Sequence, residues 1–267
     1  MRNPMMCAAI LLTAVLTSSA LAVDPGLVAW YQLNDNASDS SENGKNGTVH
    51  NTISAADRFG NADGALSFNG SNSHVGLPNN KPIWLPQNDF TLSAWVRFDR
   101  NPLDSSHEFV LGLNFSFWPT QSLCMGYSIF RNAGDGKARF QMETASATSN
   151  LNSQNALAKD VWYHIVGVRS GTVQQMYIDG QLNVSGSCPA EPIKFSAPNN
   201  DYRANIGVMS DGSWTSGVYY LDGAVDDVRI YNRALTGDEI QQLYNVPEPA
   251  TLLLLGLGAV MLRRKKH

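Results

Sequence analysis

Carboxylate and amide side chains gather in one glycine-containing stretch near the N-terminal end, residues 39–47. Asp39, Asn43 and Asn46 each offer a side-chain oxygen, and Gly47 lets the chain turn its carbonyl oxygen inward. Calcium in proteins takes about six to eight oxygens from such groups. The stretch therefore predicts a calcium-binding loop, with Ca²⁺ in a structural role.

A second carboxylate, Asp226, could complete that site from the last strand pattern, residues 221–231. Period-two spacing places Asp226 on the apolar face of this strand, where a carboxylate needs a metal, an arginine or several amides as a partner. Two alternatives need no metal. Asp39 could cap an Asx-turn, and Asp226 could accept backbone amides or pair with Arg58 or Arg229.

Aromatic residues in loops are the candidates for sugar binding, because sugar rings stack on indole and phenol rings while nearby polar groups bind the hydroxyls. The aromatic residues in Gly/Pro/Asn-rich stretches are Trp84, Trp118, Tyr202 and Trp214. The tryptophans within strand patterns, which we expect in the core, are Trp30, Trp95 and Trp162. Packing at the rim of the domain is the alternative role for the loop group.

Catalytic patterns are missing from the sequence. Retaining glycoside hydrolases need two carboxylates about 5–5.5 Å apart, and the six glutamates form no Glu-x-Asp-x-x-Glu pattern. The five histidines have no metal-binding spacing, and neither a nucleophile elbow nor a phosphate-binding loop occurs. We expect no enzyme, and a glycoside hydrolase is the least favoured alternative.

Short strands must position these residues, because Gly, Asn, Ser and Asp recur at short intervals and helical periodicity is absent until the end. Residues 90–97 alternate apolar and polar, except that Trp95 interrupts the polar side, which predicts a strand covered on both faces. The predicted strands are Leu27–Leu33, Ala65–Phe68, His74–Leu77, Phe90–Arg97, Glu108–Leu113, Tyr127–Phe130, Ala138–Met142, Trp162–Arg169, Gln174–Ile178, Gln181–Ser185, Ala204–Val208 and Tyr219–Tyr231.

Three local signals refine this layout. Asp179-Gly180 between two strand patterns predicts a tight hairpin, because a type I′ turn needs positive φ. The Asn/Ser-rich residues 144–156 predict a loop. Thr236 with Glu239 three residues later predicts a capping box that starts one short C-terminal helix.

The N-terminal residues 1–22 have the charge, apolar run and small-residue cleavage site of a signal peptide. Residues 23–249 contain 14 basic against 23 acidic residues, a balance of −9, which argues against nucleic acid as a partner. Export also places Cys124 and Cys188 in an oxidising compartment, where we expect them to form a disulfide. Two buried thiols are the alternative.

The C-terminal end has three ordered features: Val246-Pro247-Glu248-Pro249, a run of uncharged residues 250–262, and the basic residues 263–266. A helix over the run covers roughly 20 Å of an apolar layer about 30 Å thick, so it predicts a short transmembrane helix with its basic end in the cytoplasm. These features resemble the PEP-CTERM sorting tail of Gram-negative bacteria over residues 246–267. The resemblance implies an exosortase as processing enzyme and delivery to the cell envelope or extracellular matrix; a plain tail anchor is the alternative.

Seven motifs follow one another between the two ends: GLVAWYQLND, DSSENGKNGT, GALSFNGSNSHVGLP, FTLSAWVRF, WYHIVGV, MYIDGQL and GAVDDVRIYNRAL. Together they resemble the laminin-G-like jelly roll of the concanavalin A-like lectin/glucanase superfamily. The resemblance implies one all-β domain over residues 27–244, a two-sheet antiparallel jelly-roll sandwich. Its members bind carbohydrate or protein, often with a structural calcium ion, and Asp39 and Asp226 match the metal positions.

These observations predict a secreted binding module of the cell envelope or extracellular matrix that recognises polysaccharide and holds a calcium ion. A surface protein whose partner is another envelope protein is the alternative.

Overall fold

The computed structural model describes residues 24–41, 43–78, 89–102, 105–115, 124–144, 146–193, 203–209 and 219–245, with the side chains of 113–115, 124–125 and 203 excepted. The predicted signal peptide, residues 1–22, and the predicted tail, residues 246–267, lie outside this part of the chain. Within it, no helix has both the length and the apolar character that crossing a membrane requires.

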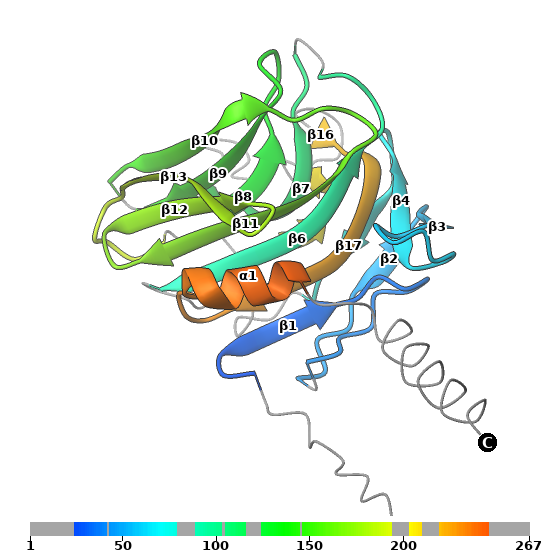
Figure 1. Cartoon of the computed structure of the whole chain (residues 1–267), viewed down its shortest axis with the longest axis horizontal. Coiled ribbons are helices and arrows are strands. Elements are labelled where there is room, and N and C mark those ends of the chain that lie inside the picture. Colours follow the sequence, from blue (N-terminus) through cyan, green and yellow to red (C-terminus); the bar gives the residue numbers. More distant parts are fainter. Residues whose placement is uncertain are drawn as a thin grey trace, which may run out of the picture.

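Two antiparallel sheets stacked face to face form the domain (Figure 1). The first, sheet A, has eight strands, with β1 pairing β17 beside the main path. In spatial order the main path is β13 (Gln181–Ser187), β12 (Val173–Ile178), β11 (Trp162–Ser170), β6 (Phe90–Phe98), β17 (Asp222–Tyr231), β4 (Ala65–Asn69) and β3 (Ile53–Ala55), and β1 spans Leu27–Tyr31.

Sheet B has seven strands and lies across the core from sheet A. Its order is β10 (Thr148–Ala156), β9 (Lys137–Glu143), β8 (Cys124–Arg131), β7 (Glu108–Phe115), β14 (Arg203–Ile206), β5 (His74–Gly76) and β2 (Thr48–His50). A further short pair joins β15 (Val208–Met209) to β16 (Tyr219–Tyr220). The predicted all-β jelly-roll sandwich is confirmed.

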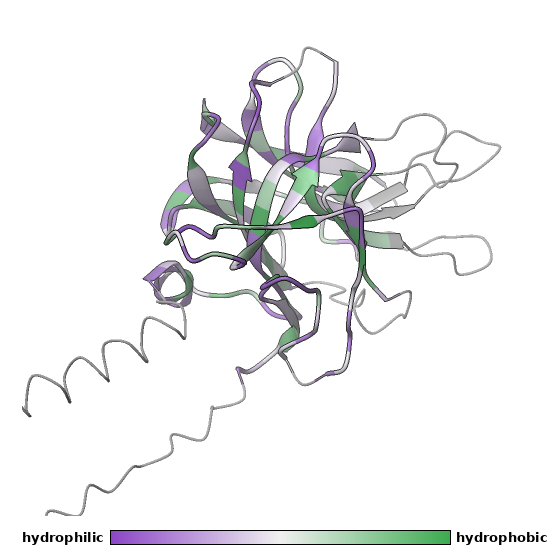
Figure 2. Cartoon of the chain, turned by 90° about the vertical axis from the view of Figure 1, so that its right-hand side faces the viewer, coloured by the Kyte–Doolittle hydropathy of each residue, from purple (hydrophilic) through white to green (hydrophobic). Residues whose placement is uncertain are grey.

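The main core lies between the sheets, where alternate residues of each strand point inward. Figure 2 shows hydrophobic residues along the strands and hydrophilic ones in the outer turns. The sheets approach closely at Gly167, where an added Cβ would lie 2.7 Å from the Phe140 ring, so a larger residue would separate the sheets. Core residues of the two sheets include Phe90, Leu92, Val96 and Phe98 of β6 and Val110, Ile129, Phe140 and Ile206 of sheet B.

The outer face of sheet A is covered in part by the helix α1 (Gly237–Asn245). A second apolar cluster joins Val166 of β11 and Tyr231 of β17 to Leu235 and the fully buried Ile240. Burying an isoleucine stabilises a fold by about 1.5–3 kcal/mol, so this contact holds the helix on the sheet. Strand β6 is therefore covered on both faces, as the position of Trp95 in its sequence predicted.

Of the local predictions, the hairpin turn is confirmed and the loop is wrong. Asp179 (φ 51°) and Gly180 (φ 75°) form the predicted tight turn between β12 and β13. The prediction of a loop over residues 144–156 is wrong, because β10 pairs with β9 through Leu151 and Phe140. Two further short strands, β2 and β3, carry exposed side chains at Val49 and Ile53 and had no apolar alternation to reveal them.

Candidate functional site

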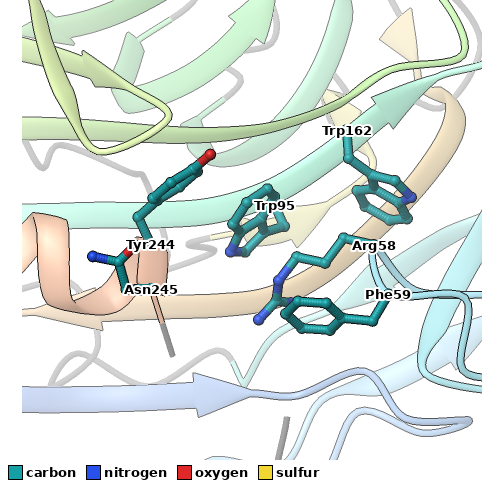
Figure 3. A pocket seen from close by; sticks show the side chains of 6 residues that line it. All are labelled: Arg58, Phe59, Trp95, Trp162, Tyr244 and Asn245. Atoms are coloured by element: carbon teal, nitrogen blue, oxygen red, sulfur yellow. The ribbon is translucent and has the colours of Figure 1, made fainter. Parts of the chain in front are cut away.

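A pocket of about 370 Å³ opens on the outer face of sheet A, next to the last turn of α1 (Figure 3). Its walls come from three places in the chain: the loop between β3 and β4, the strands β6 and β11, and the end of the helix. The residues that line it are Arg58, Phe59, Trp95, Trp162, Tyr244 and Asn245.

Two tryptophans on adjacent strands form the sheet side of the pocket. In the register between β6 and β11, His164 lies opposite Trp95 and Trp162 lies opposite Arg97. Residues two apart on a strand share a face, so both indoles project to the outer side of the sheet. The Trp95 side chain is only 7% exposed, whereas Trp162 is half-buried. The expectation that Trp162 is a core residue is therefore wrong.

The opposite wall is the loop that carries Arg58 and Phe59, and Asp57 fixes its shape. The buried Asp57 carboxylate accepts the backbone N–H groups of Phe59 and Asn61, both at 2.8 Å, and the Asn61 side-chain amide at 2.8 Å. Gly64 closes the loop, since a Cβ there would lie 2.8 Å from an Asp57 oxygen. The turn leaves the Phe59 ring 52% exposed beside the pocket.

The Arg58 guanidinium lies between two rings, 4.5 Å from the centroid of Phe59 and 4.6 Å from that of Trp95. Its nitrogens also bind two carboxylates of β17: Nη1 lies 2.5 Å from Asp226 Oδ2, and Nη2 lies 3.3 Å from Asp227 Oδ2. Cation–π contact and ion pairing together hold the side chain, which is 3% exposed. The guanidinium therefore acts as a fixed, planar part of the pocket wall.

A β-bulge brings both carboxylates to this side of the sheet. Asp227 has φ 52°, and the register between β17 and β6 shifts between Asp226 and Arg229. Neighbouring residues of a regular strand point to opposite faces, and a bulge breaks that alternation. Val225, Val228 and Ile230 consequently face the core between the sheets. The prediction that Asp226 shares the face of Val228 and Ile230 is wrong, and its predicted alternative partner Arg58 is confirmed.

A buried polar layer continues beneath the tryptophan. His164 Nε2 lies 2.9 Å from Ser93 Oγ, and the imidazole stacks on Trp95 with centroids 5.1 Å apart. Burial lowers the pKa of His164 to about 3, with further lowering by the charges of Arg229 and Arg58. The imidazole is therefore neutral at neutral pH and serves as a packed ring under the pocket.

The last turn of α1 supplies the third wall. At the other end of the helix the predicted capping box is formed, with Thr236 N donating to Glu239 Oε2 at 2.8 Å and Glu239 N donating to Thr236 Oγ1 at 3.3 Å. The helix runs from there to Tyr244, whose ring stacks on Trp95 with centroids 5.4 Å apart. Asn245 ends the helix at the pocket with an amide that can both donate and accept hydrogen bonds.

The predicted calcium residues do not assemble into a cation site. Asp39 Oδ1 accepts the N–H groups of Trp30 (3.0 Å) and Ser41 (2.9 Å), and Oδ2 accepts that of Lys45 (2.9 Å). These bonds outweigh burial, which acts in the opposite direction, and hold the pKa of Asp39 below its usual value. N–H groups that point at a carboxylate repel a cation. This is the Asx-type alternative for Asp39.

The other members of that predicted set contact the loop and its neighbouring strands. Asn46 Oδ1 accepts the N–H of Asp39 at 2.9 Å, and Asn43 Nδ2 donates to the Leu27 carbonyl at 3.0 Å. Gly47 meets a packing need, since a Cβ there would lie 2.9 Å from Val75. Asp226 is held by Arg58, and no group of three His, Cys, Asp or Glu side chains that could hold a metal ion occurs among the described residues. In this geometry the residues do not fit a calcium ion.

The remaining predictions concern the sugar-binding residues and the disulfide. The candidate sugar-binding residues Trp84, Trp118, Tyr202 and Trp214 lie outside the described residues. Cys188 is a free, buried thiol whose Sγ donates to the Gly171 carbonyl at 3.7 Å. Because Cys188 is free, the predicted disulfide with Cys124 is not formed in this structure.

Sequence reasoning missed Phe59 and Tyr244 as pocket residues. The pattern Asp57-Arg58-Phe59-Gly60-Asn61, with an acid and a glycine around an exposed aromatic, was the available signal for the loop. Nothing in the sequence alone places this loop beside the helix end. It arrives there because β4 pairs with β17, with Leu66 opposite Val225, which brings the preceding loop close to Asp226.

The pocket thus combines aromatic rings, one guanidinium paired with carboxylates and one exposed carboxamide on the outer face of a jelly-roll sandwich. The comparison with known families agrees: residues 69–241 match the model described as "Concanavalin A-like lectin/glucanases superfamily". The chain belongs to this superfamily.

Solved structures with the same fold span binding domains and enzymes. Domain 4 of AbnA, an extracellular arabinanase from Geobacillus stearothermophilus in complex with arabinotriose, is 20% identical with a TM-score of 0.59, over 82% of this chain and 98% of that domain. The sialidase of Trypanosoma rangeli in complex with sialic acid is 21% identical with a TM-score of 0.58, over 82% of this chain and 32% of that chain. The binding domain of botulinum neurotoxin DC in complex with SialylT is 15% identical with a TM-score of 0.58, over 84% of this chain and 52% of that chain.

The chain thus spans about a third of the sialidase and half of the neurotoxin domain, and at these identities the likeness establishes the fold alone. Residues 245–266 match the PEP-CTERM protein-sorting motif. The motif indicates export, with an envelope or extracellular location in a Gram-negative bacterium, and processing by an exosortase. The resemblance seen in the sequence is confirmed for both regions.

Proposed function

We propose that this protein is a non-catalytic carbohydrate-binding module of the cell envelope or extracellular matrix, and that the pocket beside α1 is its saccharide site. The observation that carries the proposal is the convergence of Phe59, Trp95, Trp162 and Tyr244 around one guanidinium. Sugar rings present apolar C–H faces to aromatic rings and hydroxyl groups to polar side chains, and this pocket offers both kinds of contact.

The exposure of each side chain indicates its role in the pocket. Phe59 and Trp162 present accessible ring surface, whereas Trp95 is sandwiched and supports them. Asn245 is exposed and supplies donors and an acceptor for hydroxyls. The volume of about 370 Å³ lies toward the small end of the roughly 300–1,000 Å³ range of ligand pockets, which suits a short stretch of a sugar chain.

Three features favour binding over catalysis. The Asp226 and Asp227 carboxylates are engaged by Arg58, and His164 is neutral and buried. Among the residues that the structure describes, no carboxylate lines the pocket as the acid or nucleophile that glycoside hydrolysis requires. Calcium is left out of this proposal because the residues chosen for it do not fit the ion.

The test is retention of the exported protein by a panel of polysaccharides in affinity electrophoresis, with Trp162→Ala as the pocket variant and Leu182→Ala as its control. Leu182 is an exposed apolar residue on β13 and is not among the residues that line the pocket. We expect the native protein and the control to be retained by at least one polymer and Trp162→Ala to lose retention. Retention of none, or equal retention of Trp162→Ala, would overturn the proposal.

A further inference from the structure

The charged groups that the structure describes around the pocket are paired with opposite charges. Arg58 is the one charged residue that lines the pocket among those the structure describes, and two carboxylates hold it. Asp227 also accepts a hydrogen bond from Arg229 Nη2 at 3.3 Å and from Trp30 Nε1 at 2.7 Å. Two guanidiniums and two carboxylates thus alternate beneath the pocket and sum to zero.

At the rim beside Trp162, each cation is again paired with a carboxylate. The Arg97 guanidinium lies 5.5 Å from the Trp162 ring centroid, and it binds Asp99 through two contacts, of 2.6 and 3.0 Å. Lys159 pairs with Asp160 at 3.2 Å. His164 adds no charge at neutral pH, because burial holds the pKa of its imidazole far below the usual range.

An acidic saccharide therefore meets no unpaired cation among the described residues around the pocket. To bind a carboxylate or sulfate, Arg58 would have to release a carboxylate that is 1% exposed, which would leave a buried charge without its partner. The surrounding domain adds repulsion, since residues 23–249 carry a balance of −9. A neutral saccharide meets neither cost, because ring stacking and hydroxyl hydrogen bonds need no net charge.

We infer that the pocket selects neutral polysaccharide chains and rejects uronate, sialate and sulfate-bearing ones. This inference rests on the proposed function and adds the ligand class to it. It also separates this chain from the neighbours crystallised with sialic acid, an acidic sugar, despite the shared fold.

The experiment compares polymers that differ only in charge. Methyl-esterified and de-esterified homogalacturonan form one pair, and desulfated and native carrageenan form another, with neutral galactan and arabinan included. We expect the exported protein to bind neutral members at least about tenfold more tightly than charged ones, since like charge costs at least the ~1.4 kcal/mol of one decade. Binding of the neutral polymers should not change between low and high salt.

One substitution tests the charge argument directly. Asp99→Asn leaves the Arg97 cation beside Trp162 without its carboxylate, so it should raise affinity for the de-esterified polymer severalfold and make that binding weaken with salt. Asp135→Asn changes the net charge equally in the turn between β8 and β9 of the other sheet, and it should change neither preference. These two residues are partly or fully exposed, so both variants should fold.

The outcomes separate the two proposals. Tighter, salt-sensitive binding of the charged polymers by the native protein would overturn the neutral-ligand inference and leave the saccharide site in place. Equal responses of Asp99→Asn and Asp135→Asn would also overturn it. Failure to bind any polymer would remove the saccharide site and the inference with it.

Discussion

Arg58 Nη1 and Asp226 Oδ2 lie 2.5 Å apart, and this buried ion pair joins the β3–β4 loop to the last strand of sheet A. It occupies the carboxylate that would otherwise need a metal. It also places the guanidinium between the rings of Phe59 and Trp95. The fold, the absence of a cation site at Asp226 and the shape of the pocket therefore depend on the same contact.

Removing the guanidinium should be costly. Arg58→Ala leaves the Asp226 and Asp227 carboxylates buried without their cation, and breaking such a pair costs about 3–5 kcal/mol of unfolding free energy. The control Arg97→Ala breaks a half-exposed pair with Asp99 and should cost about 0–1 kcal/mol. Urea midpoints measure both, and similar small losses would show that the buried pair is not holding the loop.

The exposed ring of Phe59 separates binding from stability. Because the ring is 52% exposed, Phe59→Ala should change the unfolding free energy by less than about 1 kcal/mol. The same variant should weaken polysaccharide retention severalfold, since it removes an accessible stacking surface at the pocket. Phe59→Tyr keeps the ring and should bind like the native protein; a tyrosine variant as weak as the alanine one would argue against stacking.

Acid should destabilise the protein through His164. Its folded pKa is about 3 against an ordinary value of about 6.5, so between those values the unfolded chain binds a proton that the folded protein does not. Stability is therefore full above about pH 6.5 and falls as pH drops toward 3, by up to about 1.4 kcal/mol per pH unit for this group.

Chemical denaturation from pH 7 to 4 measures this slope, and His164→Gln should flatten it. Gln can still approach Ser93 but takes up no proton. His74, whose pKa is also lowered to about 4 by burial and by His50, contributes its own part of the slope, and that part should persist in His164→Gln. An unchanged slope for His164→Gln would contradict the assignment.

Chelation should leave the domain unaffected. The oxygens of Asp39 accept three backbone amides and Asp226 pairs with Arg58, so these residues need no calcium to be satisfied. We expect Tm to be the same in EDTA and in millimolar calcium. A rise in Tm that follows calcium concentration, as ligand binding to the folded state would give, would restore the metal site predicted from sequence.

The capping box should set the stability of the helix that walls the pocket. Thr236→Ala removes the hydroxyl that accepts the Glu239 N–H and should cost about 1 kcal/mol. Thr236→Ser keeps the hydroxyl and should cost little. Differential scanning calorimetry of the native protein and the two variants compares their Tm values. Equal Tm values would mean that packing at Ile240 alone holds the helix.

The sequence predicts those parts of this fold whose physics is local. Alternation along β6, positive φ at Asp179-Gly180 and the Thr236–Glu239 box each act within a few residues, and each is found in the structure. Strand β10 was missed because only Leu151 and Ser153 of it are buried, so its pairing with β9 decides its structure.

The site was harder to predict because its residues meet only through sheet topology. Trp95 and Trp162 looked like core residues on strand patterns, but both lie on the outer face of sheet A, where Trp162 is half-buried and Trp95 is buried against His164 and Tyr244. The bulge at Asp227 also reversed the expected facing of Asp226, and no residue spacing revealed it. Trp162 at the start of β11 and Phe59 on the β3–β4 loop meet at the pocket because β4 pairs with β17.

The helix end has a practical consequence. Tyr244 and Asn245 wall the pocket, and the sorting motif starts at residue 245, so any extension fused directly after the helix is attached at the rim. Asp24 lies by Tyr231 and Arg233, near the first turn of α1 and away from that rim. A purification tag or surface-coupling handle therefore belongs on the N-terminal side of the domain, where it does not crowd incoming polymer.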